Sequence, residues 1–517
     1  MSNNFDIITN SSTSKLKLVL KSLLVGVMTS FVAILYRYAL AYAEEYSFIF
    51  YNFQRNNKWI IPFCFIILAI IGWIVGKIVE KEPFSGGSGI PQVKGIVGGY
   101  LTNRPISIIF YKFIGGVLSI ICGLSLGREG PSVQLGACTG DILSKKFKSS
   151  RLERRLLMSS GASAGLAAAF NAPLSGVLFS LEEIYKYFSP LVLLSTITAA
   201  VASDFIAKEF FGLQPVFNFG KTTPIPLTNY WLLIILGLIL GISGVFYNWC
   251  TLNSQKIYGK IKLKSSTKMI IPFLFAGVIG LIFPVVLCGG HAVIESLSLS
   301  STLELLILIL IGKFIFSMIS FGSGAPGGIF FPLLIIGGSI GALFGYVVIN
   351  YFGVNPEFFN NFIIISMAGY FTAIVRAPIT GIILITEMTN SLSHLLSLTI
   401  VSIIAYIVAE AFKSKPIYDS LLDSLLKKNN INEYHKESTK KIIIANIIHF
   451  GSKAENKTIK DIVLPPNALI VSIKRGQATI VPKGDTILKA GDEILTMTDL
   501  SNEWKIRESL EALTTVY

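Results

Sequence analysis

The sequence predicts a polytopic, all-α membrane protein that carries a small soluble α+β domain after its last membrane segment. Three observations support this fold class. Apolar residues make up 52% of the 517 residues and charged residues only 14%, whereas soluble domains carry about 25% charged residues. Uncharged runs recur, and a spanning helix needs about 20 apolar residues, so we expect on the order of ten or more hydrophobic segments. Strand-like alternation follows near the C-terminal end.

Composition divides the chain into four segments. Residues 1–17 are polar, too polar for a cleaved secretory signal, so the first apolar run, Leu18–Tyr42, is expected to remain as an anchor. Residues 18–425 hold the long uncharged runs and form the expected membrane domain. Residues 426–440 are polar and charged, which is typical of a linker, and residues 441–517 form the expected soluble domain.

The net charge of +14 does not indicate nucleic-acid binding, because the basic residues cluster beside the apolar runs. Clusters at 145–155, 256–268 and 413–441 are typical of cytoplasmic loops. We therefore expect a multi-pass protein in the lipid bilayer of a prokaryotic cytoplasmic membrane, with both termini in the cytoplasm. The five cysteines show no pairing or ligand spacing, so neither a disulfide framework nor a metal site is expected.

Two blocks rich in glycine and proline occur twice in the same order. GREGPSVQLGACTG (127–140) matches GIFFPLLIIGGSIG (328–341) at a constant offset. AAAFNAPLSGVLFSLEE (167–183) matches FTAIVRAPITGIILITEM (371–388) at an offset only slightly larger. Ordered blocks with glycine breaks at corresponding places indicate a duplicated membrane core of the kind found in secondary transporters.

The glycine breaks interrupt hydrophobic segments, where lipid cannot satisfy exposed backbone amides and carbonyls. Such backbone is tolerated only where it is buried in protein or lines a polar cavity. Each break, including GSGIP (87–91), precedes a stretch that is expected to begin a helix. The first four amides of a helix lack intrahelical partners, and its dipole adds about half a positive charge. Several helix N-termini directed at one point would therefore bind an anion.

Four stretches in this order resemble the signature stretches of the ClC family of chloride channels and chloride/proton antiporters. They are GSGIP at 87, GREGP at 127, GGIFFP at 327 and KPIYDSLL at 415. The resemblance covers about residues 20–425. It implies an inverted internal repeat with broken helices, and a homodimer with one anion pathway in each subunit. It also implies chloride and protons as substrates and no cofactor.

By motif position, the resemblance implies a central anion site of two hydroxyls and two backbone amides: Ser88, Tyr418, Ile329 and Phe330. An outer site would use backbone amides around Arg128, Gly130 and Phe331. Neutral donors of this kind suit an anion that must both enter and leave a pathway. Chloride is the expected anion, with bromide and nitrate also permeant.

Glu129 lies among these amide donors, where its carboxylate can occupy the anion site itself and leave it on protonation. The resemblance implies that Glu129 is the gating glutamate of the family, and intramembrane ionisable residues are functional by default. The alternative is a structural ion pair with Arg128, which adjacent positions on a helix disfavour. A functional role for the Arg128 side chain, in addition to a structural one, stays an open alternative.

A second proton carrier distinguishes an antiporter from a channel. Glu183 lies at the motif position of the internal proton glutamate of antiporters, whereas Glu182 repeats as Glu387 and is expected to serve structure. Glu129 and Glu183 together favour chloride/proton antiport. A passive voltage- or pH-gated chloride channel, with two solvated carboxylates at a helix end, is the alternative. Phe331 replaces the smaller residue of many relatives, which predicts a narrower outer vestibule.

The C-terminal segment alternates in four strand-like runs separated by glycine and proline turns. The stretch NALIVSIKRGQATIVPKGDTILKAGDEILTMTD (467–499) resembles the RCK C-terminal (TrkA-C) domain of potassium-transport regulators. This resemblance implies a domain that can dimerise, with a small regulatory molecule as a conceivable ligand. Its two Gly-Asp dipeptides are interpreted as tight-turn residues.

Two other functions fit poorly. GASAG (161–165) matches a hydrolase nucleophile motif, but that motif needs a strand–turn–helix context. Here it lies in a small-residue membrane segment, where such residues permit close helix packing. A potassium transporter, suggested by the C-terminal resemblance alone, would need oxygen ligands, whereas helix N-termini repel cations. We therefore expect a transporter and not an enzyme.

Overall fold

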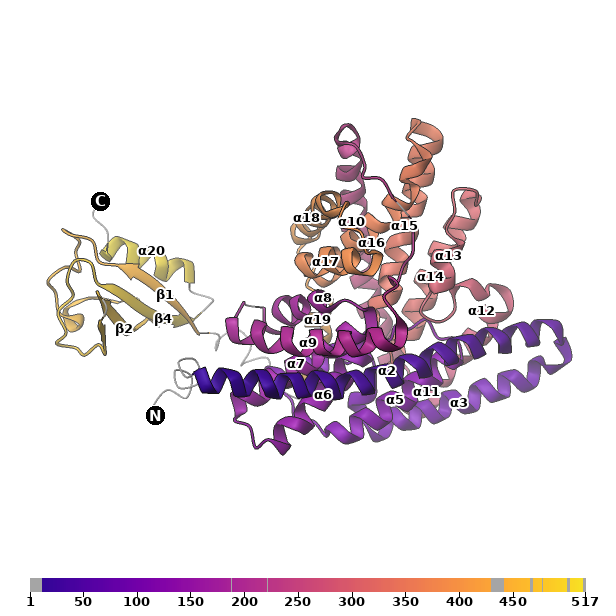
Figure 1. Ribbon diagram of the computed structural model, residues 1–517, viewed down its shortest axis with the longest axis horizontal. Coiled ribbons are helices and arrows are strands. Elements are labelled where there is room, and N and C mark those ends of the chain that lie inside the picture. Colours follow the sequence, from indigo (N-terminus) through magenta and orange to yellow (C-terminus); the bar gives the residue numbers. More distant parts are fainter. Residues whose placement is uncertain are drawn as a thin grey trace. The chain divides into compact units, whose positions relative to one another are not determined.

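The computed structural model describes residues 12–186, 188–220, 222–428, 441–464, 468–476, 478–499 and 503–514. The chain forms two compact units, Met1–Leu422 and Asp423–Tyr517 (Figure 1). Residues 1–11 of the expected N-terminal segment and residues 429–440 of the expected linker lie outside the described residues.

Helices joined by loops make up the described residues of the first unit. Its first half contains α2 (Ser12–Asn56), α3 (Ile61–Lys81), α4 (Ile90–Val97), α5 (Pro105–Ile121), α6 (Glu129–Lys146), α7 (Arg151–Phe170), α8 (Pro173–Phe179), the π-helical segment Ser180–Tyr185 and α9 (Pro190–Phe211). Its second half contains α10 (Tyr230–Lys260), α11 (Ser265–Lys268), α12 (Ile270–Ile282), α13 (His291–Ser296), α14 (Leu303–Gly322), α15 (Phe330–Phe352), α16 (Phe359–Val375), α17 (Pro378–Thr389), α18 (Leu395–Ala411) and α19 (Ile417–Lys428). Short 3₁₀ turns join some of them: Lys58–Ile60, Pro83–Ser85, Leu227–Asn229, Pro284–Val286 and Pro356–Phe358.

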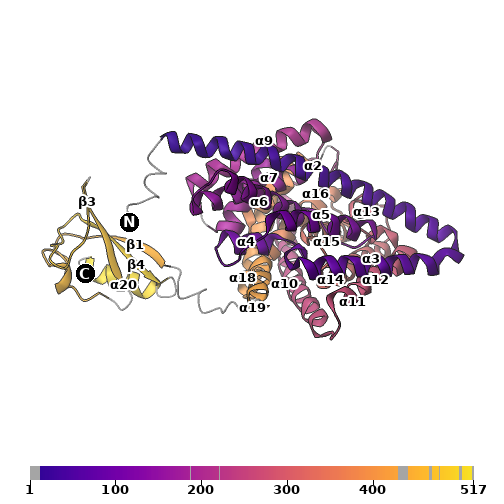
Figure 2. The same cartoon turned by 90° about the horizontal axis from the view of Figure 1, so that it is seen from below.

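Within the described residues, eight helices are long and apolar enough to cross a membrane, and three shorter apolar helices accompany them. This agrees with the ten or more hydrophobic segments expected from the sequence. The first apolar run lies in α2, which the 3₁₀ turn Lys58–Ile60 connects to α3 (Figures 1 and 2). Large apolar side chains on these long helices, such as Leu35 and Phe63, are exposed. The chain is therefore a multi-pass membrane protein with an apolar exterior.

The internal repeat appears as helices that begin at corresponding positions in the two halves. Glu129 begins α6 and Phe330 begins α15, at the offset of the first pair of repeated blocks. Pro173 begins α8 and Pro378 begins α17, at the offset of the second pair. In each half the helix after the glycine break packs against the next helix, α6 on α7 and α15 on α16. These are the broken helices and the repeat that the sequence predicted.

Small residues bring α6 and α7 into backbone contact. A Cβ atom added at Gly161 or Gly165 of α7 would collide with backbone atoms of Gly136 or Ser132 in α6. The motif GASAG thus packs one membrane helix against another, as its small residues indicated. Its central serine, Ser163, shares a hydrogen bond of 2.7 Å with the hydroxyl of Ser180.

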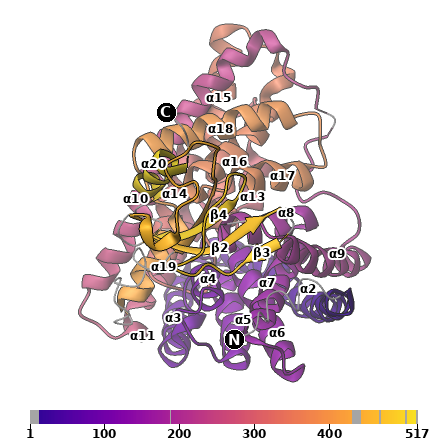
Figure 3. The ribbon, with the colours of Figure 1, turned by 90° about the vertical axis from the view of Figure 1, so that its left-hand side faces the viewer.

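The second unit contains a four-stranded antiparallel sheet in the order β1-β4-β2-β3. Its strands are β1 (Lys441–Ile447), β2 (Leu469–Arg475), β3 (Ala478–Ile480) and β4 (Glu493–Asp499), and the helix α20 (Glu503–Thr514) contacts β1 and β4 (Figure 2). Strands β2 and β3 lie side by side (Figure 3). Gly476, which follows the last residue of β2, has a φ of +59°. The four strands coincide with the four alternating runs of the sequence.

Candidate anion and proton site

Backbone hydrogen bonds join three glycine loops at the centre of the membrane unit. Gly127 and Gly328 bond in both directions, at 2.7 Å from Gly127 N to Gly328 O and 2.8 Å from Gly328 N to Gly127 O. The Gly87 amide donates to Gly324 O, and the Gly327 amide donates to Gly87 O, both at 3.1 Å. Each loop therefore satisfies part of the backbone of another, which lipid could not do.

These loops lead directly into three helices, α4 from Ile90, α6 from Glu129 and α15 from Phe330. Each helix has a proline in its first turn: Pro91, Pro131 and Pro332. A missing N–H costs little in the first turn, where amides have no intrahelical partner. The remaining first-turn amides of α6 and α15 converge because the Gly127–Gly328 pair holds both loops together.

Two buried hydroxyls in this region lack hydrogen-bond partners among the described residues. They are Ser88 Oγ and Tyr418 Oη. Gly130 lies directly against Ser88, within reach of its hydroxyl. The Tyr418 ring meets Phe179 edge-on at 6.4 Å, and Phe179 meets Phe330 at 6.2 Å. An unsatisfied buried hydroxyl costs about 1–3 kcal/mol, so a shared anion would give both groups a partner.

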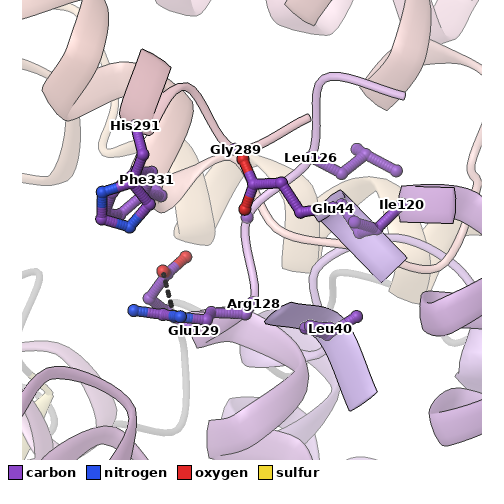
Figure 4. Close-up of a pocket in the computed structure, with 10 residues that line it drawn as sticks. Leu40, Glu44, Ile120, Leu126, Arg128, Glu129, Gly289, His291 and Phe331 are labelled. Atoms are coloured by element: carbon purple, nitrogen blue, oxygen red, sulfur yellow. Dashed lines mark ion pairs between the residues drawn. The ribbon is translucent and has the colours of Figure 1, made fainter. Parts of the chain in front are cut away.

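The carboxylate of Glu129 is fully buried at the start of α6. The amides of Glu129 itself and of Phe331 lie close enough to stabilise it electrostatically, although neither makes a hydrogen bond of good geometry with it. The carboxylate faces a cavity of about 30 Å³ (Figure 4). A cavity of that size holds a water molecule. The carboxylate thus lies near the amide of Phe331, one of the amides expected at the outer anion site.

The contact between Arg128 and Glu129 differs from the sequence interpretation, in which adjacent helix positions disfavoured an ion pair. The Nε of Arg128 lies 3.9 Å from Glu129 Oε1, so the two adjacent residues do form a loose ion pair (Figure 4). The spacing rule for helices does not apply, because Arg128 is the N-cap of α6 and precedes its first turn. The pair is long for a charge-assisted hydrogen bond, which is usually about 2.7–2.9 Å.

Aromatic rings lie at the Glu129 cavity. Phe331 lies 4.8 Å from the His291 ring and 5.6 Å from the Phe217 ring, between centroids. His291 and Phe331 both line the cavity (Figure 4). His291 was not anticipated from the sequence. It begins α13 directly after Gly290, whose φ of +114° matches the φ of +96° at Gly89, the equivalent residue of the first half, so the repeat could have indicated it.

Two fully buried lysines, also missed, hold the loops at equivalent places in the two halves. Lys112 Nζ donates to the carbonyls of Ser85 and Gly87, at 3.0 and 2.5 Å. Lys313, its counterpart in the second half, donates to the carbonyls of Val286 and Cys288, at 3.1 and 2.8 Å. Each ammonium thus donates hydrogen bonds to loop carbonyls that a continuous helix would have bonded internally.

Glu183 lies apart from the Glu129 cavity, in the π-helical segment after α8, and is 1% exposed. Its Oε1 accepts a hydrogen bond from Lys94 Nζ at 2.7 Å. Lys94 also pairs with Asp419, which in turn pairs with Lys186. Tyr418, next to Asp419, is within electrostatic range of both Glu183 and Glu129. No sequence pattern indicated that Lys94 and Asp419 would meet, because 325 residues separate them.

Glu182 and Glu387 cap helices of the opposite half. Glu182 accepts hydrogen bonds from the amides of Ile379 and Thr380 at the start of α17, at 3.2 and 2.7 Å. Glu387 accepts the equivalent bonds at the start of α8, from the amides of Leu174 and Ser175 at 3.1 and 2.9 Å. Carboxylates at helix N-termini are stabilising, which accounts for this repeated pair.

The fold and the site define an inverted-repeat membrane protein with broken helices. A family model described as voltage gated chloride channel matches residues 67–410, and one described as TrkA-C domain matches residues 446–509. The chain therefore belongs to the voltage-gated chloride channel family and ends in a TrkA-C domain. Both resemblances noted in the sequence are confirmed.

Curated relatives and solved structures agree with this assignment. The chain is 32% identical to the H(+)/Cl(-) exchange transporter ClcA of Salmonella arizonae over 435 residues, 82% of this chain and 92% of the relative. The same-named protein of Yersinia pseudotuberculosis is 31% identical over 429 residues, 81% of this chain and 90% of the relative. A slow cyanobacterial Cl⁻/H⁺ antiporter has a TM-score of 0.76 at 28% identity, covering 80% of this chain and 99% of that structure.

Proposed function

We propose that this protein exchanges chloride for protons across a membrane, with Glu129 as the gate and Glu183 as the inner proton carrier. The observation that carries the proposal is the burial of the Glu129 carboxylate at the N-terminus of α6, beside hydroxyls that lack partners among the described residues. The exchange transporters among the relatives favour antiport over a passive channel.

The proposed mechanism follows from charge. The ionised Glu129 occupies the outer end of the anion pathway and competes with chloride for the amides of α6 and α15. Protonation removes that charge, so chloride takes the place of the side chain and meets neutral donors. The central anion would be held by Ser88 and Tyr418 hydroxyls with the backbone amides of Ile329 and Phe330. In the outer site, the amides around Arg128, Gly130 and Phe331 would hold it.

Glu183 would supply the proton from the other side of Tyr418. It is buried and paired with Lys94, whose contact with a partly exposed Asp419 connects it toward solvent. A proton could thus reach Glu129 only when Glu183 has bound one. Because of this dependence, a chloride gradient would drive proton movement.

The test uses full-length protein in liposomes under a chloride gradient, with internal pH and chloride followed together. Wild type should move protons uphill. Glu183→Ala should retain chloride flux and lose proton movement, and Glu129→Gln should retain chloride flux that no longer depends on pH. Glu410→Ala changes an exposed glutamate at the end of α18 and should match wild type. Wild-type chloride flux without proton movement would make the protein a channel.

Further properties belong to this proposal. We propose a homodimer with one pathway per subunit, placed in a bacterial cytoplasmic membrane with both termini in the cytoplasm. The TrkA-C unit would regulate transport through a small molecule. Deletion of residues 440–517 should then abolish the response to that molecule while transport persists, and cross-linking in liposomes should give a dimer.

A further inference from the structure

Lys94 is a buried cation that contacts two carboxylates from distant parts of the chain. Its Nζ lies 2.7 Å from Glu183 Oε1 and pairs directly with Asp419. The exposed fractions of the side chains are 2% for Glu183, 9% for Lys94 and 26% for Asp419. The contacts therefore run from a partly exposed carboxylate through a buried ammonium to a fully buried carboxylate.

These groups lie on the elements that carry the central hydroxyls. Lys94 belongs to α4, which begins just after Ser88. Asp419 follows Tyr418 in the first turn of α19. The Lys94 ammonium thus links α4 and α19 to Glu183, the proposed proton carrier. These two helices hold or follow the proposed chloride ligands Tyr418 and Ser88.

The cluster is electrically balanced, with Lys94 and Lys186 opposing Glu183 and Asp419. Several charged side chains on α7 and α9 contact residues outside the cluster. From α7, Arg154 donates to Asp141 and Arg155 lies against Gly99. From α9, Asp204 pairs with Lys208. The polar groups nearby are the phenols of Tyr418 in α19 and Tyr185 in the π-helical segment, and Tyr185 accepts a hydrogen bond from Ser159 at 3.1 Å.

Resting on the exchange function proposed above, we propose that Lys94 and Asp419 are positioning residues that set the internal pH at which Glu183 takes up and releases its proton. Their effects on the protonation of Glu183 are opposite. Lys94 stabilises the ionised carboxylate. Asp419 competes for the same ammonium and repels that carboxylate, so it favours the protonated form.

Removal of either charge should therefore move the pH dependence in opposite directions. In Asp419→Asn, Lys94 would act on Glu183 alone, and proton flux would require a more acidic interior. In Lys94→Met, a buried Glu183 would face Asp419 without a cation between them, and its protonated form would persist to more alkaline internal pH. A neighbouring charge at this range shifts a titration by about 1–3 units, so shifts of about one unit are expected.

The experiment measures proton and chloride flux by full-length protein in liposomes over a series of internal pH values. Lys94→Arg keeps the charge and should restore the wild-type midpoint. The matched controls Asp204→Asn and Lys208→Met remove the same charges from an ion pair of 2.6 Å in α9 that does not touch Glu183, and should leave the midpoint in place. The expected result is an acid shift for Asp419→Asn and an alkaline shift for Lys94→Met.

Unshifted or equally shifted midpoints, in variants that still couple protons to chloride, would overturn this inference alone. A wild-type protein that moves no protons would overturn the proposed function first and the inference with it. If Lys94→Met elutes as aggregate, Asp419→Asn decides the matter, because its side chain is partly exposed and its loss leaves Lys94 paired with Glu183. An unshifted Asp419→Asn then overturns the inference.

Discussion

Gly127 and Gly328 exchange backbone hydrogen bonds at 2.7 and 2.8 Å, although they belong to different halves of the chain. They occupy equivalent positions in the repeat, so the pair lies where the two halves meet. The proposed gate Glu129 and the amide of Phe331 follow within three residues of this contact on either side. The geometry of the proposed outer anion site thus depends on two residues without side chains.

The two glycines should differ sharply in their tolerance of a methyl group. A Cβ at Gly127 would collide with the Glu129 carboxylate and lie 3.0 Å from the Phe331 amide. At Gly328 the nearest atom would be the Gly130 amide at 3.2 Å. Overpacking costs about 1–3 kcal/mol. We expect Gly127→Ala to reduce chloride flux by about tenfold or more, since about 1.4 kcal/mol corresponds to tenfold.

Chloride efflux from liposomes would check this, with Gly328→Ala as the matched control that retains most of its flux. Equal losses in the two variants would mean that the hydrogen-bonded pair itself, and not the space beside Glu129, limits substitution.

Phe331 should limit the rate at which anions reach the gate. Its ring lines the Glu129 cavity and contacts the rings of His291 and Phe217. We expect Phe331→Ala to widen this vestibule and to raise chloride turnover by up to about tenfold, equivalent to about 1.4 kcal/mol of barrier. Turnover at saturating chloride would be compared with that of Phe352→Ala, which removes an exposed ring from the same helix. An unchanged turnover would place the slow step elsewhere.

Substitution of Glu182 should affect the stability of the protein, whereas substitution of the adjacent Glu183 should affect proton coupling. Glu182 holds two backbone amides and the Thr380 hydroxyl at the start of α17. Hydrogen bonds to charged groups are worth about 1.5–3 kcal/mol, so Glu182→Ala should lower the free energy of unfolding by about 2 kcal/mol or more. The ratio of protons to chloride should stay at the wild-type value.

Thermal unfolding in detergent would measure the first effect, and flux in liposomes the second. Glu304→Ala, at an exposed position in the first turn of α14, is the control for loss of a glutamate near a helix N-terminus. A Glu182→Ala protein of normal stability that fails to couple would assign Glu182 to the proton pathway instead.

Acid should destabilise the TrkA-C unit through Asp492. Burial would raise the pKa of this carboxyl, but two hydrogen bonds from Arg475, at 2.8 and 2.7 Å, and one from the Lys489 amide hold it below its usual value. A lowered folded-state pKa gives stability that is fully present above the unfolded value of about 3.9 and is lost as pH falls through the folded value.

Urea unfolding of the fragment 441–517 should therefore show stability declining below about pH 4. Asp492→Asn should already be less stable at neutral pH, by about 1.5–3 kcal/mol for weakened hydrogen bonds from a partly exposed arginine, and should lose part of the acid dependence. Thr498→Ser, a small change on the buried face of β4, serves as the reference. Identical acid profiles for the wild type and Asp492→Asn would assign the effect to other carboxylates.

Much of this architecture could be predicted from local patterns. Apolar runs, glycine breaks and the constant offsets between repeated blocks can be read along the chain, so they indicated the broken helices and the position of Glu129. Contacts between distant segments left no such pattern. The ammonium of Lys94 meets Asp419 across 325 residues, and Arg128 pairs with Glu129 only because the helix begins after it.

The exchanged caps bear on how the two halves could have arisen. Glu182, from the first half, satisfies amides of α17 in the second, and Glu387 does the reverse for α8. Either half alone would leave a partly buried carboxylate and a helix start unmatched. Two identical ancestral chains that capped each other's helices before a linker joined them would give this arrangement. If the chain were divided in the connection between α9 and α10, the two fragments should still assemble in one membrane, because each supplies the helix cap that the other lacks.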